Sequence, residues 1–368
     1  MGDEILGYLN AGGDPQDLET ILTSAEFVAK AGLEGSEARV IIRDVTGDRT
    51  ADTLLEFDNG WKGRLYVFVC LDDHYLRSHT DQYAIIRFAA VEDANGDGTS
   101  EIAYYRREMG GSWSFYDCFF VIEWDGQQFV QLIDGDADCG AHKAFSFYTT
   151  NYGLRDIDDN GTKELLLEQS PGRPECGGGP TRGWTDIWMW NGSRFVFNYR
   201  EYDPAGYRFQ AAQDGDDATK AHRYDPALAF YQQVLLDEGL LPIGPSGEAM
   251  CEGTILPYAD PDERQRLEAY ASFRIMLLHA QRGLVEDAKA AHEAMLQKYP
   301  TGAAGHAYAE LAEAFWDDYQ ESHDMGLACT AAIQFAQDHA ADVLTPLGRE
   351  TYGWVNRDYA PEDICPFP

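Results

Sequence analysis

The sequence is poor in basic residues: it has 28 Lys and Arg against 63 Asp and Glu, and its formal net charge is −35. A surface this negative repels nucleic acid and anionic lipid at long range. It also contains no basic run of the kind that marks a nucleic-acid patch, so we expect no nucleic-acid partner. The excess carboxylates have three explanations: solubility, a salty medium, or service as metal ligands.

Long apolar runs are absent as well. No stretch approaches the roughly 18 consecutive apolar residues that a membrane-spanning helix requires, so we expect no membrane span. The N-terminal residues MGDEILGYLN have neither the basic region nor the apolar region of a signal peptide. Two origins stay open, a cytoplasmic protein and an exported protein whose leader has been removed.

Familiar catalytic motifs are also missing. The sequence contains no HExxH zinc motif, no GxSxG turn and no CxxC pair. Carboxylates are too numerous for any two to be singled out as the acid and base of a glycosidase. We therefore predict that the protein is not an enzyme.

The seven cysteines leave the redox state open. Cys118 and Cys139 flank an expected hairpin, so they can pair across it. Cys365, in the C-terminal tail, can pair with Cys329 or with Cys251. The alternative is that all seven are reduced and fill apolar space.

Short runs of Val, Ile, Phe and Tyr, separated by Asp, Asn and Gly, fill the first half of the chain and predict strands. Asp125-Gly126 and Asn191-Gly192 are typical of hairpin turns. The segments VIEWDGQQFVQL and IWMWNGSRFVFN around these turns resemble each other, which indicates an internal repeat. The expected strands are ARVIIR, DTLLEF, RLYVFVCL, YAIIRFAAV, EIAYYRR, FYDCFFVIEW, QFVQLI, KAFSFYTT, KELLLEQ, DIWMWN and RFVFNY.

Four segments follow from the pattern along the chain. The N-terminal segment is helical, because Asp14-Pro15 is typical of a helix start and apolar residues then recur at helical spacing. Ala, Leu and Met at three- and four-residue spacing predict helices in the last third. The segments are a helical start at 1–36, strands at 37–203, a helix and linker at 204–262, and helices with an irregular tail at 263–368.

Three nine-residue acidic segments between expected strands share one arrangement of oxygen atoms. They begin at Asp44, Asp93 and Asp156, and each has oxygen-bearing side chains at positions 1, 3, 5 and 9. A backbone carbonyl at position 7 adds another oxygen. Calcium takes six to eight oxygen ligands, whereas magnesium demands stricter octahedral geometry, so the spacing predicts calcium.

Local details distinguish the three segments. Gly98 and Gly161, at position 6, permit the left-handed backbone that wraps a chain around an ion. The first segment has Thr46 at position 3 and Arg49 at position 6, so we expect it to bind most weakly. The segments are not EF-hands, because position 12 carries no Glu and the flanks read as strands. The alternative is that they are ordinary Asp, Asn and Gly turns.

The pattern D-x-[DNT]-x-[DN]-G-x-x-[DE] between strands resembles the calcium loops of FG-GAP or VCBS-type repeats, the blades of integrin-like β-propellers. The resemblance covers about residues 38–203 and implies that each loop joins the first two strands of a four-stranded blade. It also implies calcium ligands at Asp44, Thr46, Asp48, Thr50, Asp52, Asp93, Asn95, Asp97, Thr99, Glu101, Asp156, Asp158, Asn160, Thr162 and Glu164. About three blades are too few for a closed propeller, so an open stack capped by helices or an additional blade is required.

The segment from Ser272 to Pro300 resembles a tetratricopeptide repeat. Gly283 falls at the turn between its helices and Ala288 at the close helix contact, although His292 replaces the usual aromatic residue. A second unit runs from Ala303 to His339. The resemblance implies a groove for a partner, and the alternative is an ordinary helical bundle.

Together these patterns predict an α+β multidomain protein, with about three antiparallel, propeller-like β blades followed by a tetratricopeptide-like helical region. The expected function is calcium binding by a secreted or cell-surface protein that contacts a protein or glycan partner. The alternative is a secreted hydrolase of polysaccharide or peptide with the blades as an accessory. Exposed blade edges need cover, either from the tail with Tyr352, Trp354 and Tyr359 or from a second copy of the chain.

Overall fold

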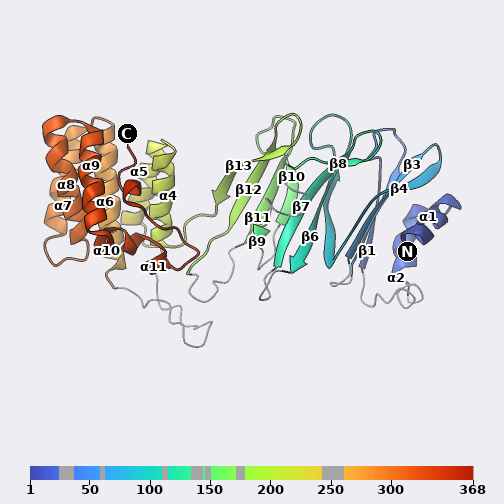
Figure 1. Ribbon diagram of the computed structural model, residues 1–368, viewed down its shortest axis with the longest axis horizontal. Helices are drawn as coiled ribbons and strands as arrows, with labels where there is room; N and C mark the ends of the chain where they lie inside the picture. Colours follow the sequence, from blue (N-terminus) through green and yellow to red (C-terminus); the bar gives the residue numbers. More distant parts are fainter. Residues whose placement is uncertain are drawn as a thin grey trace. The chain divides into compact units, whose positions relative to one another are not determined.

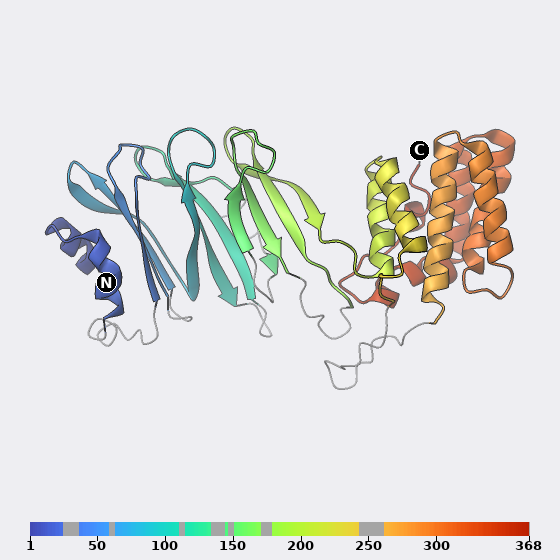
Figure 2. The same cartoon turned by 180° about the vertical axis from the view of Figure 1, so that it is seen from behind.

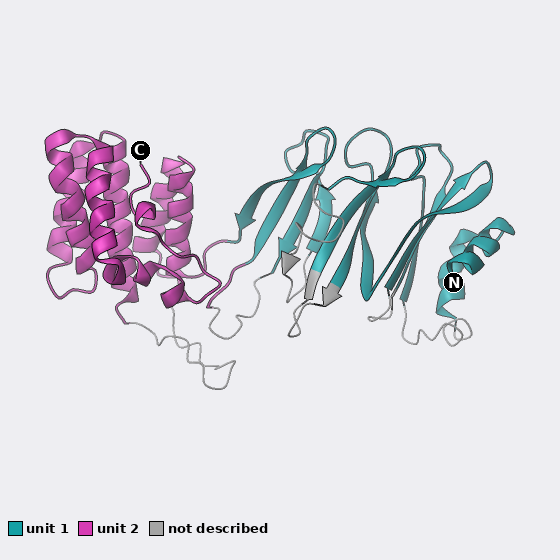
Figure 3. Ribbon diagram, in the orientation of Figure 1, with its two compact units in different colours: residues 1–172, 183–203 teal, residues 173–182, 204–368 magenta. Residues whose placement is uncertain are grey.

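The computed structural model describes residues 1–24, 37–58, 63–109, 115–133, 144–145, 151–170, 179–242 and 261–367. The chain forms two compact units (Figure 3): a β unit of residues 1–172 and 183–203, and a helical unit of residues 173–182 and 204–368. Strands in the first half and helices in the second confirm the expected α+β class. Within the described ranges, no helix is both long enough and apolar enough to cross a membrane.

The β unit contains three antiparallel sheets whose neighbouring strands follow one another in the chain (Figure 1). The first sheet is β1 (Glu37–Arg43), β2 (Asp52–Asp58), β3 (Gly63–Leu71) and β4 (His74–Tyr83). The second is β5 (Ile85–Glu92), β6 (Glu101–Met109), β7 (Phe115–Trp124) and β8 (Phe129–Gln131), with β9 (Ala144–Phe145) paired to β7. The third is β10 (Asn151–Arg155), β11 (Glu164–Gln169), β12 (Trp184–Trp190) and β13 (Phe195–Tyr202).

The expected strands largely agree with these sheets. Each expected run coincides with a strand, except that β9 covers only Ala144–Phe145 of the run at 143–150, the rest of which lies outside the described residues. Gly126 and Gly192 have φ of 97° and 96°, as the two expected hairpin turns require. The sequence patterns missed β4 and β10, both of which lie at sheet edges.

The N-terminal segment is helical over the part that the structure describes. It contains α1 (Gly2–Asn10), the 3-10 turn η1 (Pro15–Asp17) and α2 (Leu18–Thr23). The expected start at Asp14-Pro15 is confirmed, because the Asp14 carboxylate accepts the N–H of Gln16 at 2.9 Å. Residues 25–36 of the predicted segment lie outside the described ranges.

The three sheets stack face to face because strands such as β3 carry apolar side chains on both faces, since successive residues of a strand point to opposite sides. On β3, Leu65 and Val67 pack against the second sheet, whereas Tyr66 and Phe68 on the opposite face pack against α1 and α2. The second sheet likewise buries one face on the first sheet and the other on the third, where Phe119 contacts the apolar side chains of β11 and β12. Figure 2 shows the stack from behind, with the N-terminal helices beside the first sheet.

The helical unit is built from pairs of sequential helices that pack against each other. The pairs are α4 (Arg208–Lys220) with α5 (Tyr224–Leu236), α6 (Glu263–Gln281) with α7 (Val285–Lys298), and α8 (His306–Ser322) with α9 (Met325–Asp338). The short segments α10 (Ala340–Val343), η3 (Thr345–Leu347), α11 (Arg349–Tyr352) and η4 (Pro361–Asp363) follow.

These helix bounds correct two expectations and support a third. The expected helix in the linker segment is α5, but α4 precedes it and was not predicted. The first helix of the expected repeat begins at Glu263 rather than at Ser272. Gly283 does lie between α6 and α7, with φ of 72°, as a turn residue there requires.

A buried polar cluster centred on Asp216 ties the C-terminal tail to the helices. Asp216 and Arg274 are each 1% exposed, and their charged atoms lie 3.5 Å apart. The Asp216 carboxylate accepts hydrogen bonds from the hydroxyls of Tyr231, Tyr270 and Tyr359 at 2.7, 2.8 and 2.6 Å. Arg274 also donates to the main-chain carbonyls of residues 363 and 364 in the tail. The cluster therefore joins α4, α5 and α6 to the end of the chain.

The tail packs onto the helices, as expected, and a disulfide between Cys329 and Cys365 holds it there. Tyr352 stacks on Phe209 with ring centroids 4.1 Å apart. Tyr352 thus belongs to the core of the helical unit, and Tyr359 packs against that core. In the β unit, Cys118 is disulfide-bonded and Cys70 is free and buried, whereas residues 139, 176 and 251 lie outside the described ranges.

Candidate metal centre

The three acidic segments occupy the same place in their sheets. The first acidic loop (44–52) joins β1 to β2, the second (93–101) joins β5 to β6, and the third (156–164) joins β10 to β11. Neighbouring loops also touch. Arg43 Nε donates to Ser100 Oγ at 3.3 Å, and the N–H of Lys163 donates to the carbonyl of Ala94 at 2.7 Å. The loops therefore form a continuous row across the stack.

The same hydrogen bonds shape all three loops. The Asp at position 1 accepts the N–H of position 6, the side chain at position 5 accepts the N–H of position 7, and the carboxylate at position 9 accepts the N–H of position 2. Position 6 has positive φ throughout: 71° at Arg49, 96° at Gly98 and 89° at Gly161. The bonded pairs are Asp44 with Arg49, Asp48 with Thr50, Asp52 with Val45, Asp93 with Gly98, Asp97 with Thr99, Glu101 with Ala94, Asp156 with Gly161, Asn160 with Thr162, and Glu164 with Ile157.

Carboxylates gather in two of the loops. In each cluster, one oxygen from every member lies within 4.8 Å of the others. The second loop contributes Asp93, Asp97 and Glu101, and the third contributes Asp156, Asp158 and Glu164. Asn95 and Asn160 are the amide members of the same loops, and their Oδ1 atoms accept backbone N–H groups. Each of these loops therefore brings together three carboxylates with further oxygen donors, a set that suits a hard divalent cation.

The first loop forms no such cluster within the residues that the structure describes. Its position 9 is Asp52, one methylene shorter than the Glu of the other loops. Both oxygens of Asp52 are engaged, since they accept the N–H groups of Val45 at 2.9 Å and Cys70 at 2.8 Å. Thr46, the expected ligand at position 3, bonds to Asp44 through its hydroxyl at 3.3 Å. Asp52 therefore anchors the loop to β3, which accounts for the absence of a carboxylate cluster in the described part of the first loop.

Glu101 is the most unusual carboxylate of the second loop. It is 0% exposed, its Oε2 accepts the N–H of Ala94 at 2.6 Å, and its buried Oε1 has no hydrogen-bond partner. Burial raises the pKa of Glu101 to about 8, and the neighbouring Glu123 carboxylate adds to the rise. Burial raises the pKa of Glu123 as well. A bound cation would offset the cost of holding both groups ionised.

The sequence patterns did not identify Glu123 as part of this site. It lies on β7, outside the acidic loop, and its Oε2 accepts a hydrogen bond from Asn95 Nδ2 at 2.8 Å. The signal was nevertheless in the internal repeat. When VIEWDG and IWMWNG are aligned, Glu123 stands where the second copy has Met189. Because the second copy has no acidic residue at this position, Glu123 indicates a role local to the second sheet rather than one that the repeat requires.

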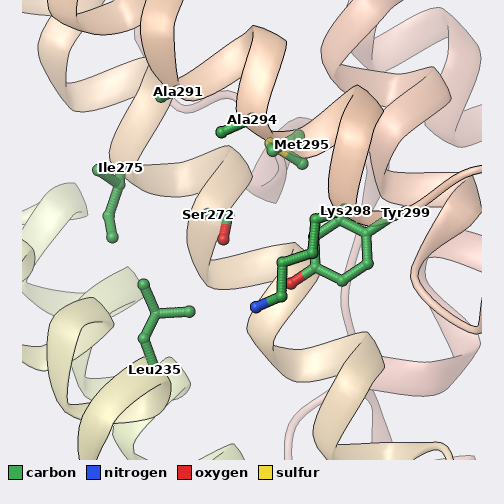
Figure 4. A pocket seen from close by; sticks show the side chains of 8 residues that line it. All are labelled: Leu235, Ser272, Ile275, Ala291, Ala294, Met295, Lys298 and Tyr299. Atoms are coloured by element: carbon green, nitrogen blue, oxygen red, sulfur yellow. The ribbon is translucent and has the colours of Figure 1, made fainter.

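The helical unit has a hollow of about 200 Å³ between α5, α6 and α7 (Figure 4). Its walls are largely apolar, with Lys298 at one side, whose ammonium group pairs with Glu268 at 3.0 Å. The lining residues are Leu235, Ser272, Ile275, Ala291, Ala294, Met295, Lys298 and Tyr299. No carboxylate is among the residues that line this hollow.

The two clusters of carboxylates lie in equivalent loops of two successive sheets, at positions 1, 5 and 9 of the second loop and 1, 3 and 9 of the third. No protein-family model matches the sequence, and a search of the curated proteins finds no match either.

Proposed function

We propose that this protein binds calcium through its second and third acidic loops, and that the stiffened β unit and the helical unit together serve to bind a protein or glycan partner. The observation that carries the proposal is the recurrence of one cluster. Three carboxylates meet within 4.8 Å in the same loop of two successive sheets. A turn with a purely structural role requires the hydrogen bonds of the loop but does not require three carboxylates to meet. The first loop illustrates this, because it has the hydrogen bonds without the cluster.

Calcium suits these clusters better than the other common cations. Its site tolerates irregular geometry and six to eight oxygens, which carboxylates, amide oxygens and a backbone carbonyl from one loop can supply. Magnesium demands a stricter octahedron and retains its waters. Soft metals prefer sulfur and imidazole, and neither is present in the loops.

The proposed class is a non-enzymatic binding protein of the FG-GAP or VCBS type. The position of each acidic loop between the first two strands of a four-stranded sheet supports it. Paired helices with Gly283 at a turn support a tetratricopeptide-like helical unit. The partner itself is tested by capture from a native extract, which should weaken when a chelator removes calcium and return when calcium is restored.

We also propose that the protein acts outside the cytoplasm. The disulfide between Cys329 and Cys365, together with the disulfide-bonded Cys118, suits an oxidising compartment. Extracellular calcium modules work with dissociation constants of about 10⁻⁴–10⁻³ M. Thiol labelling of unreduced protein from its native source should leave these three cysteines unmodified, and their full labelling would count against the location.

Calcium should raise the melting temperature of the β unit in chelator-treated protein, because an ion that binds only the folded state stabilises it. At a calcium concentration of 100 times the dissociation constant, each site should add about 2.7 kcal/mol to the free energy of unfolding. Asp97→Ala should remove the contribution of the second loop, and Asn160→Ala that of the third. Thermal unfolding with and without calcium measures both effects.

Asp48→Ala is the matched control for these variants. Asp48 also stands at position 5, and it accepts the N–H of Thr50 at 2.7 Å, as Asp97 accepts that of Thr99 at 2.8 Å. All three variants therefore lose the same turn hydrogen bond, but Asp48 belongs to the loop without a cluster. Its variant should keep nearly all of the calcium-dependent stabilisation. An equal loss in all three variants, or no calcium effect in the parent protein, would refute the proposal.

A further inference from the structure

Glu123 lies directly across the second sheet from the last residue of the acidic loop. The antiparallel strands β6 and β7 pair Ile102 with Ile122, and one further step along the register places Glu101 opposite Glu123. Directly opposed residues on antiparallel strands project from the same face at close range, and like charges there are destabilising. A cation between the two carboxylates would turn this repulsion into attraction.

The other two sheets carry no carboxylate at this place. The same extension of the register places Met189 opposite Glu164 in the third sheet and Val69 opposite Asp52 in the first. An acidic residue is therefore not a requirement of the fold at this position. Glu123 is specific to the second loop, so its role should be sought in that loop's own chemistry.

Glu101 gives independent evidence that a ligand belongs at this place. Its Oε1 is buried and, when Glu101 and Glu123 are both ionised, has no hydrogen-bond donor, while its Oε2 is already bonded to Ala94. Buried polar atoms are nearly always paired, because leaving one without a partner costs free energy. One oxygen each of Asp93 and Asp97 lies within 4.8 Å of a Glu101 oxygen, so further negative groups gather beside the buried Glu101 carboxylate.

Glu123 is also held against the loop rather than left free in solvent. Asn95 Nδ2 donates to Glu123 Oε2 at 2.8 Å, and Asn95 Oδ1 accepts the N–H of Asp97 at 2.8 Å. The hydrogen bond between Asn95 and Glu123 connects β7 to position 3 of the loop. The Glu123 carboxylate is thereby held beside the loop, just outside the 4.8 Å cluster of Asp93, Asp97 and Glu101.

We propose that Glu123 is a fourth carboxylate ligand of the second acidic loop. This loop is then the tighter calcium site, and it prefers trivalent lanthanides more strongly than the third loop does. The inference rests on the proposed binding of calcium by both loops. The second loop then offers four carboxylates, against three in the third, and the number of charged ligands tunes the affinity of a calcium site. Binding also ties β7 to the loop between β5 and β6.

The test uses Glu123→Gln in the full-length chain that also carries Asn160→Ala, so that the second loop is the remaining site. Calcium is titrated first, and terbium is then bound to count its coordinated waters from luminescence lifetimes in light and heavy water. The calcium dissociation constant should rise by about tenfold or more, because the site loses a charged ligand, and the bound terbium should gain one water. Glu201→Gln, which removes the same charge from the exposed end of β13, should change neither value.

Each outcome decides the matter. The melting temperature of Glu123→Gln in chelator should equal or exceed that of its parent, because the variant relieves the repulsion with Glu101, and this checks that it folds. Unchanged affinity and water count, in a parent that binds calcium, would overturn this inference and leave the proposed function standing. Weaker binding with an unchanged water count would show that Glu123 only positions Asn95, which also overturns its role as ligand. A parent that binds no calcium would overturn the proposed function itself.

Discussion

Asp216→Ala should destabilise the helical unit by about 3–5 kcal/mol, the cost typical of leaving one partner of a buried ion pair without its counter-charge. Arg274 is 1% exposed and would keep its charge without the carboxylate that lies 3.5 Å away. Tyr270 and Tyr359 would lose the acceptor of their hydroxyl groups. Chemical denaturation followed by the circular dichroism of the helices measures the loss.

Asp217→Ala is the adjacent control. Its carboxylate pairs with Arg357 at 2.7 Å but is 47% exposed, and pairs in solvent contribute about 1 kcal/mol or less. Asp216→Asn, which keeps the size of the side chain and an oxygen that accepts hydrogen bonds, should lie between the two alanine variants. If the alanine variants of Asp216 and Asp217 proved equally stable, the cluster would not hold the tail, and this description of the helical unit would be wrong.

Loss of the disulfide between Cys329 and Cys365 should be the second largest effect. The two residues are 36 positions apart in the sequence, and the chain-entropy model assigns about 4 kcal/mol to closing a loop of that length. We expect Cys329→Ala with Cys365→Ala to cost about 2–4 kcal/mol, because the unfolded chain gains freedom and the tail loses its attachment to α9. Denaturation of the helical unit gives the value.

The single variants provide the control for this prediction. Either substitution alone breaks the bond, so each single variant should cost nearly as much as the double variant. If the two single effects instead summed to the double effect, the cost would come from lost side-chain packing, since Cys329 and Cys365 are each 1% exposed. The disulfide would then contribute little to the stability of the fold.

Much of the β unit could be predicted because short runs of Val, Ile, Phe and Tyr are separated by Asp, Asn and Gly. Strands such as β3, with Leu65 and Val67 on one face and Tyr66 and Phe68 on the other, bury both faces and carry a strong signal. The missed strand β4 reads HYLRSHTDQY, which has no apolar alternation, and its pairing depends on hydrogen bonds to β3. Edge strands of this polar kind give single-sequence patterns little to detect.

The missed helix α4 shows how tertiary packing overrides local propensity. Its sequence RFQAAQDGDDATK contains Gly215 and several Asp residues, which disfavour helix interiors. Gly215 is needed because a Cβ there would lie 2.4 Å from the ring of Tyr231 on α5. Asp216 is needed because its carboxylate receives the tyrosine hydroxyls and faces Arg274. Both features depend on α5 and α6, so the segment alone could not reveal them.

The candidate site was predictable in its loops but not in its cross-strand partner. Residue types at fixed spacing predicted the positive φ at Gly98 and Gly161, whereas the same conformation at Arg49 and the hydrogen bonds that the loops share emerge only from the structure. Thr46 and Arg49 predict that the first loop binds most weakly, and the structure adds a separate observation, the anchoring of Asp52 to β3. Glu123 enters the site through strand register, which a loop motif does not contain.

Isothermal titration of calcium into chelator-treated protein tests the central claim most directly. The account predicts two calcium ions for each chain, with the tighter site lost in Asp97→Ala and the weaker site lost in Asn160→Ala. Asp48→Ala should retain both sites, because the first loop gathers no cluster in the described structure. Absence of binding at millimolar calcium, or two sites that persist when Asp97 and Asn160 are both replaced, would contradict it.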